Sequence, residues 1–140
     1  MTEVSNLRLW VLRAAYIFVA VGLFLFIWPA ILSHSSEWPL MNSVVSAMLG
    51  AVSILALVGV RYPLRMLPIL LFEVLWKSIW MIAVAVPLWR AGAMDAERMA
   101  TVTDIIPTII LLVAIPWPYV WAKYVRRPAE GWPPWRRAKA

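Results

Sequence analysis

Residues 14–36 read AAYIFVAVGLFLFIWPAILSHSS, an uncharged run that begins directly after Arg13 and ends directly before Glu37. A helix needs roughly 20 apolar residues to cross the hydrocarbon core of a bilayer, so this run predicts a membrane-spanning helix. Its apolar stretch is longer than the core of a signal peptide, and no small-x-small cleavage pattern follows it before His34. We therefore expect an uncleaved membrane anchor.

Three further runs, at residues 38–60, 66–89 and 105–122, are interrupted by no charged residue other than Glu73 and Lys77. Together the four runs predict spans at about 10–33, 40–60, 65–89 and 103–123. The expected fold is an all-α integral membrane protein with four transmembrane helices in an up-down antiparallel bundle. This transmembrane domain covers residues 1–125, and a basic Trp/Pro-rich cytoplasmic tail covers residues 126–140.

The composition of the 140-residue chain agrees with this class, since 64% of it is hydrophobic and only 14% is charged. A soluble body of this size cannot bury so much apolar surface, which excludes soluble enzymes, nucleic-acid-binding modules and disordered tails. The chain has no cysteine and one histidine, so most catalytic and metal-binding templates are missing. We expect a non-enzymatic protein without a cofactor or a metal site.

The distribution of Lys and Arg predicts the orientation of the chain in the membrane. Of thirteen such residues, ten lie near the N-terminus, in the turn at residues 61–65, or in the tail. Only Arg90 and Arg98 fall on the opposite side, and Lys77 lies within the third span. Both termini are therefore expected in the cytoplasm, and the compact topology with short loops is typical of a multi-pass protein of the bacterial plasma (inner) membrane.

The segment FEVLWKSIW, residues 72–80, places ionisable groups at bilayer depth. At about 100° per residue, one helix face carries Glu73, Trp76, Lys77 and Trp80. The opposite side carries Leu71, Leu75, Ile82 and Ala85. Intramembrane charges are expensive and functional by default, but an acid four residues before a base also favours a helical ion pair. The pair therefore either fixes the register of neighbouring helices, or acts as an ion relay or a contact for a substrate or partner.

The second span carries a stripe of small and polar residues, namely Asn42, Ser46, Gly50 and Ser53. Small residues at this spacing permit close approach of two helices. The alternative interpretation is a polar cavity between the second and third spans. In a hairpin of these spans Ser53 lies level with Glu73, so that its hydroxyl is expected to bond the carboxylate.

Two weaker features concern the fourth span. Thr101 and Asp104 are spaced like a capping box and predict the start of a helix there. Pro116 and Pro118 must disturb its inner end, giving either a plain kink or exposed carbonyls that line a cavity.

Basic and aromatic residues of the tail predict contact with anionic lipid headgroups. These residues are Arg126, Arg127, Trp132, Trp135, Arg136 and Arg137. The alternative interpretation is that the basic residues act only as a topology signal.

The leading functional hypothesis is an accessory or scaffold subunit that uses the polar-aromatic face of the third helix. Its expected partners are the lipid bilayer and either further copies of itself or a larger membrane complex, with no nucleic acid. A second hypothesis is a small oligomeric transporter or ion pathway with Glu73 as the titratable group. A third is a lipid-, quinone- or haem-handling membrane subunit.

Overall fold

The computed structural model describes residues 4–33 and 37–129, and every regular element in these ranges is helical. The α-helices are α1 (Asn6–Phe26), α2 (Trp28–Leu32), α3 (Leu40–Arg61), α4 (Leu67–Trp80), α5 (Val86–Arg90), α6 (Ala96–Ile105), α7 (Ile109–Ala114) and α8 (Trp117–Trp121). Short turns of other helix types join them: the π turns η1 (Met81–Ala85) and η3 (Ala122–Arg126), and the 3-10 turn η2 (Ile106–Thr108). The predicted all-α class is confirmed.

Three continuous helical segments are long and apolar enough to cross a membrane, namely Asn6–Leu32, Leu40–Arg61 and Leu67–Arg90. A fourth candidate consists of Ala96–Ala114 and Trp117–Arg126, which are bent by 76° at the break between them. The described chain therefore has three apolar spans, or up to four when the bent pair counts as one.

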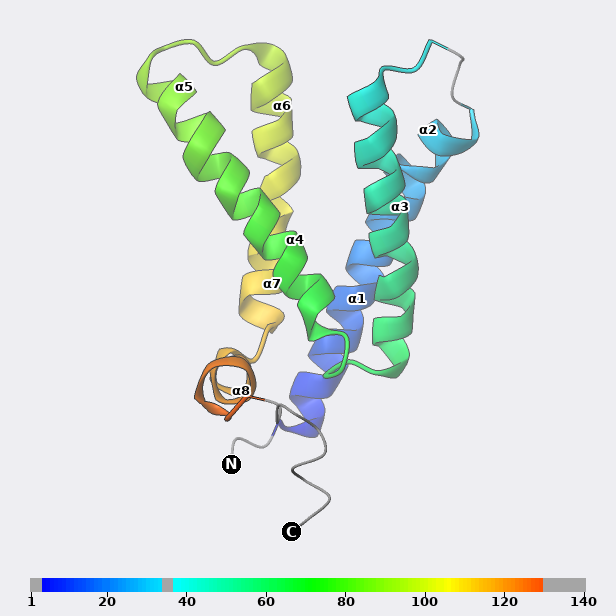
Figure 1. Cartoon of the computed structure of the whole chain (residues 1–140), viewed down its shortest axis with the longest axis vertical. Coiled ribbons are helices and arrows are strands. Elements are labelled where there is room, and N and C mark those ends of the chain that lie inside the picture. Colours follow the sequence, from blue (N-terminus) through cyan, green and yellow to red (C-terminus); the bar gives the residue numbers. More distant parts are fainter. Residues whose placement is uncertain (1–3, 34–36, 130–140) are drawn as a thin grey trace.

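The helices form two arms that meet near one end of the molecule and diverge toward the other (Figure 1). The first arm consists of α1 and α3, which make the most extensive contact between any two described helices. The second arm consists of α4 with α5 and of α6 with α7. The start of α1, the α3–α4 turn and α8 lie at the end where the arms meet, whereas α2 and the α5–α6 loop lie at the opposite end.

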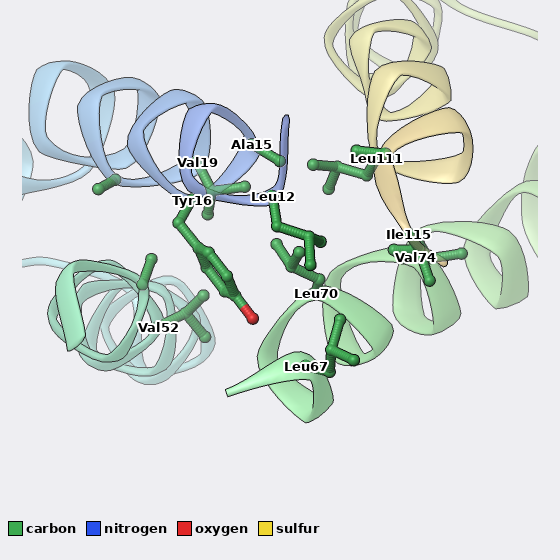
Figure 2. Close-up of a cluster of buried hydrophobic side chains, with 13 residues drawn as sticks. Leu12, Ala15, Tyr16, Val19, Val52, Leu67, Leu70, Val74, Leu111 and Ile115 are labelled. Carbon is green, nitrogen blue, oxygen red and sulfur yellow. The ribbon is translucent and has the colours of Figure 1, made fainter. Parts of the chain in front are cut away.

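The hydrophobic core lies where the two arms meet (Figure 2). It joins side chains from both arms, including Leu12, Ala15, Tyr16, Val19, Val52, Leu67, Leu70, Val74, Leu111 and Ile115. Inside a membrane, helices associate through close packing and hydrogen bonds, because lipid tails are as apolar as leucine. The fit of these side chains therefore holds the two arms together.

The contact between α1 and α3 is built around Tyr16 and Gly59. A Cβ atom at Gly59 would lie 2.4 Å from Tyr16 Cδ1, so only glycine leaves room for the ring. The Tyr16 hydroxyl donates to Pro63 O at 2.6 Å, and Arg13 Nε donates to Val60 O at 3.1 Å. These carbonyls lie at or just beyond the C-terminal end of α3, where carbonyls lack intrahelical partners. Helix α1 therefore caps α3 as well as packing against it.

Prolines account for the irregular turns of the second arm. A proline has no N–H and leaves a carbonyl of the preceding turn without its donor, which local π or 3-10 geometry can accommodate. The π turn η1 precedes Pro87, and the 3-10 turn η2 contains Pro107. At Pro116 the effect is larger, because α7 ends and the chain turns by 76° into α8. The disturbance predicted at Pro116 and Pro118 is a full break between α7 and α8.

The capping box predicted at Thr101 and Asp104 is wrong. Helix α6 begins before both residues, and its N-cap is Asp95, whose carboxylate accepts the backbone N–H of Arg98 at 2.8 Å. Thr101 instead donates its hydroxyl to Glu97 O within the helix, at 3.2 Å. The first turns of α6 are polar, so a helix start inferred from the beginning of the apolar run falls too late.

Candidate functional site on helix α4

Glu73 and Lys77 lie one turn apart on α4 and form an ion pair. Lys77 Nζ is 2.7 Å from Glu73 Oε2, and the indole N–H of Trp76 donates to Glu73 Oε1 at 3.4 Å. The Glu73 side chain is 2% exposed and the Lys77 side chain is 19% exposed. Both carboxylate oxygens thus have a partner on the same helix, which compensates for the burial of the acid without a second helix.

Two tryptophans flank the lysine. Lys77 Nζ lies 5.4 Å from the centroid of the Trp76 ring, within the range of a cation–π interaction. Trp76, Lys77 and Trp80 are all partly buried, and we call these three residues the Trp–Lys face. Leu75 and Ile82 lie elsewhere on the helical segment and are 59% and 71% exposed, as suits contact with lipid.

The depth of Lys77 makes its partial exposure chemically significant. It lies near the middle of the span Leu67–Arg90, at least about 15 Å from either end at 1.5 Å per residue. An ammonium carries three N–H donors, and within the described chain Glu73 is the one hydrogen-bond acceptor that Lys77 reaches. An unsatisfied donor in hydrocarbon costs several kcal/mol. Lys77 therefore keeps N–H donors that no side chain among the described residues accepts.

The π turn η1 changes which residues share a face beyond Trp80. A regular helix would place Ala85 opposite Glu73, with Leu75 and Ile82, as the sequence predicts. In the structure Ala85 is buried, so this prediction is wrong. A π turn holds more residues than an α turn and rotates the residues after it relative to those before it.

The Ser53 hydroxyl does not donate to Glu73. Its oxygen accepts the indole N–H of Trp28 at 2.9 Å and donates to Gly50 O at 2.5 Å, so its only proton is used within α3. A Cβ atom at Gly50 would lie 3.1 Å from Ile31 Cδ1, which shows that α2 packs directly over this stripe. The predicted Ser53–Glu73 bond is wrong because this part of α3 faces α2.

The outer part of the same stripe is more open. Ser46 is partly buried and Asn42 is exposed, and neither contributes to the ion pair on α4. The structure thus separates the two groups of polar residues that the sequence suggested as complements.

The tail residues predicted to contact anionic lipid are only partly described. Arg126 and Arg127 are exposed at the end of η3. Trp132, Trp135, Arg136 and Arg137 lie outside the described residues. Contact of this segment with lipid headgroups remains a prediction.

The sequence did not predict the side chains that bond the carbonyls at the end of α7, beside the break before α8. Arg8 Nη1 donates to Val113 O at 3.1 Å, and the indole N–H of Trp117 donates to Leu112 O at 2.8 Å. The break at Pro116 removes the intrahelical donors for carbonyls at the end of α7. The prolines do signal such unpaired carbonyls, but no spacing in the sequence points to an arginine on α1.

Within the described residues, no three His, Cys, Asp or Glu side chains gather as a metal site would require. The chain matches no protein-family model, no curated protein and no solved structure. The assignment of a function therefore depends on the geometry and charge of the chain itself.

Proposed function

We propose that this protein is a non-enzymatic accessory or scaffold subunit of the plasma membrane. Its Trp–Lys face binds a helix of a partner, either a second copy of the chain or another membrane protein. In the proposed topology the bent pair is the fourth span, and both termini are cytoplasmic.

The charge distribution supports this orientation. The elements at the end where the arms meet carry Arg8, Arg13, Arg61, Arg65, Lys123, Arg126 and Arg127. The described acids other than Glu73 lie away from this end: Glu37, Asp95 and Glu97 are in or beside the loops of the opposite end, and Asp104 is in the last turn of α6. Since Lys and Arg favour the cytoplasmic side, the end where the arms meet is assigned to the cytoplasm.

The proposal depends on one observation: the Lys77 ammonium has more N–H donors than the described residues have acceptors for it. The described residues supply one acceptor, Glu73, for three N–H donors at mid-span depth. A partner helix that brings a carbonyl, hydroxyl or amide oxygen to Lys77 would satisfy the remaining donors, and Trp76 and Trp80 would supply apolar contact area around them. A helix face that combines spare donors with partly buried aromatic rings is better suited to protein than to lipid.

Native mass spectrometry of the protein in lipid-retaining particles tests this proposal. We expect the wild type to run as a complex of fixed stoichiometry, heavier than the 15.9 kDa monomer. Trp80→Ala removes an aromatic group from the Trp–Lys face and should release most of the partner. Trp89→Ala is the matched control, because Trp89 is 70% exposed and lies outside that face. A monomeric wild type, or equal loss in both variants, would contradict the proposal.

Ion or substrate transport is the second candidate function. It is favoured by the buried Glu73 carboxylate together with the break of the fourth span at Pro116, because intramembrane acids and broken helices both occur in transport pathways. Glu73→Gln keeps the shape of the side chain and removes its negative charge. Loss of proton-coupled flux with unchanged assembly would favour transport, whereas weakened assembly without any flux in the wild type would favour the scaffold.

A further inference from the structure

Two hollows run along α1 on the side that faces the broken fourth span. The first, of about 410 Å³, is lined by residues that include Ser5, Arg8, Pro116 and Tyr119. The second, of about 420 Å³, lies between α1 and α7 and is lined by residues that include Ala14, Phe18, Ile110 and Val113. Val11 lines both hollows, so the two are neighbours along α1.

The two hollows differ in chemistry. All residues lining the second are apolar, whereas the first contains the Arg8 guanidinium and the Ser5 hydroxyl. Arg8 uses one N–H to hold Val113 O, and a guanidinium has five N–H donors in all. Lys123 lies nearby, with Nζ 5.7 Å from the ring centroid of Tyr119, which also lines the first hollow. A basic pocket therefore neighbours an apolar groove.

The two hollows follow one another in the same order as the headgroup and the acyl chain of a membrane lipid. The start of α1 and α8 lie at one end of the molecule (Figure 1), and the apolar groove extends from there along α1 toward the diverging arms. From Val11 to Phe18 the groove covers about 10 Å of helix at 1.5 Å per residue. The basic pocket would thus lie at headgroup level and the groove at the level of acyl chains.

We propose that this composite site binds one anionic glycerophospholipid, with its phosphate on Arg8 and an acyl chain in the groove between α1 and α7. Guanidinium and phosphate form charge-assisted, often bidentate hydrogen bonds. The acyl chain fills a space that side chains of this molecule leave open. The inference does not depend on the proposed partner of the Trp–Lys face on α4.

A second copy of the chain is a poorer occupant than a lipid. To neutralise Arg8 in the same membrane orientation, a copy would need an acid at the end where the arms meet. Of the acids that the structure describes, Glu37, Asp95 and Glu97 lie in or beside the loops of the opposite end, and Asp104 lies in the last turn of α6. The described charged side chains at the pocket, Arg8 and Lys123, are both basic and therefore favour a phosphate group.

Lipid titration of the detergent-solubilised full chain, followed by native mass spectrometry, tests the inference. The probes are phosphatidylglycerol and phosphatidylcholine with identical acyl chains. We expect one phosphatidylglycerol molecule to bind about tenfold more tightly than phosphatidylcholine, because the choline cation offsets the phosphate charge beside Arg8 and Lys123. Arg8→Gln should remove this preference. Arg61→Gln, the control, makes the same charge change at the same end but outside the site, and should preserve the preference.

A variant in the groove keeps the test decisive if loss of the Arg8–Val113 bond disturbs the fold. Ala14→Phe fills the apolar groove without altering either arginine, and should weaken the binding of both lipids about tenfold. Equal affinity for the two lipids would overturn the inference. So would an equal effect of Arg61→Gln and Arg8→Gln, or unchanged phosphatidylglycerol binding by Ala14→Phe.

Discussion

The two arms of the molecule differ in how their polar groups find hydrogen-bond partners. In the α1–α3 arm, Tyr16 fits against Gly59, and the tyrosine hydroxyl and Arg13 cap carbonyls at the end of α3. In the second arm, prolines interrupt the helices, and the charged pair Glu73–Lys77 is satisfied only within α4. In the first arm, hydrogen bonds between helices satisfy the polar groups. In the second arm, N–H donors of Lys77 have no acceptor among the described residues.

This difference suggests that the α1–α3 arm stabilises the fold, whereas the second arm provides the surface for interaction. Close packing and interhelical hydrogen bonds are the main sources of helix association inside a bilayer, and the α1–α3 contact has both. Regions with fewer buried contacts are those in which proteins accommodate binding and movement. We therefore expect substitutions in the first arm to alter the free energy of unfolding most strongly, and substitutions on the Trp–Lys face to alter assembly.

The largest expected effect is that of Gly59→Ala. The new Cβ would overlap the Tyr16 ring, which is fully buried and held by Pro63 O, so neither side chain can move away cheaply. We expect a loss of about 2–3 kcal/mol in the free energy of unfolding, measured by denaturant titration in mixed micelles. Gly22→Ala is the control, because a Cβ there meets nothing within 4 Å, and it should leave stability unchanged or slightly raised.

Glu73→Gln should have the next largest effect. It leaves the Lys77 ammonium without its counter-charge, and we expect a loss of about 2 kcal/mol, reduced from the value for a fully buried pair by the 19% exposure of Lys77. The double variant Glu73→Gln/Lys77→Gln should recover most of that loss, since no unpaired charge remains. If the double variant lost as much free energy of unfolding as Glu73→Gln and Lys77→Gln together, the two residues would not act as a pair.

Arg13→Gln tests the cap that α1 provides for α3. It removes the bond to Val60 O and a cation near the C-terminal end of that helix, for an expected loss of about 1 kcal/mol. Arg61→Gln serves as the comparison, because Arg61 is exposed in the last turn of α3 and has no such interhelical bond. Equal losses in the two variants would mean that general charge, rather than the Val60 bond, stabilises this end.

Trp117→Phe should have the smallest effect. Its indole N–H holds Leu112 O beside the break between α7 and α8, but the side chain is exposed. We expect a loss of about 0.5 kcal/mol, measured in the same micelle titration. A loss larger than that of Arg13→Gln would show that the bond to Leu112 O contributes more to stability than the bond to Val60 O.

Local patterns in the sequence predicted several features of the second arm. Uncharged runs indicated the apolar helices, and the spacing of Glu73 and Lys77 predicted their ion pair, because both signals lie within one helix. The prolines near residue 116 located the break. Each of these features depends on neighbours along the chain, which periodicity and residue type report directly.

Features that depend on distant residues were not predictable in the same way. The partner of Ser53 is Trp28 rather than Glu73 because α2 folds back onto α3, and no pattern specifies that contact. The π turn that buries Ala85 adds a residue to one turn, which a fixed angle per residue cannot represent. The caps that α1 provides require knowledge of which helix ends lie beside it.

Site-specific photo-cross-linking in native membranes tests whether the Trp–Lys face binds a partner protein. The chain has no cysteine, so Val84→Cys and Ile82→Cys each give one attachment point for a benzophenone probe. Val84 is partly buried one turn beyond Trp80, whereas Ile82 is exposed at a similar depth on another side of the helix. We expect a discrete protein adduct from position 84 and only lipid adducts from position 82. The same products from both positions, or no protein adduct at position 84, would contradict the assignment of the Trp–Lys face as a partner-binding surface.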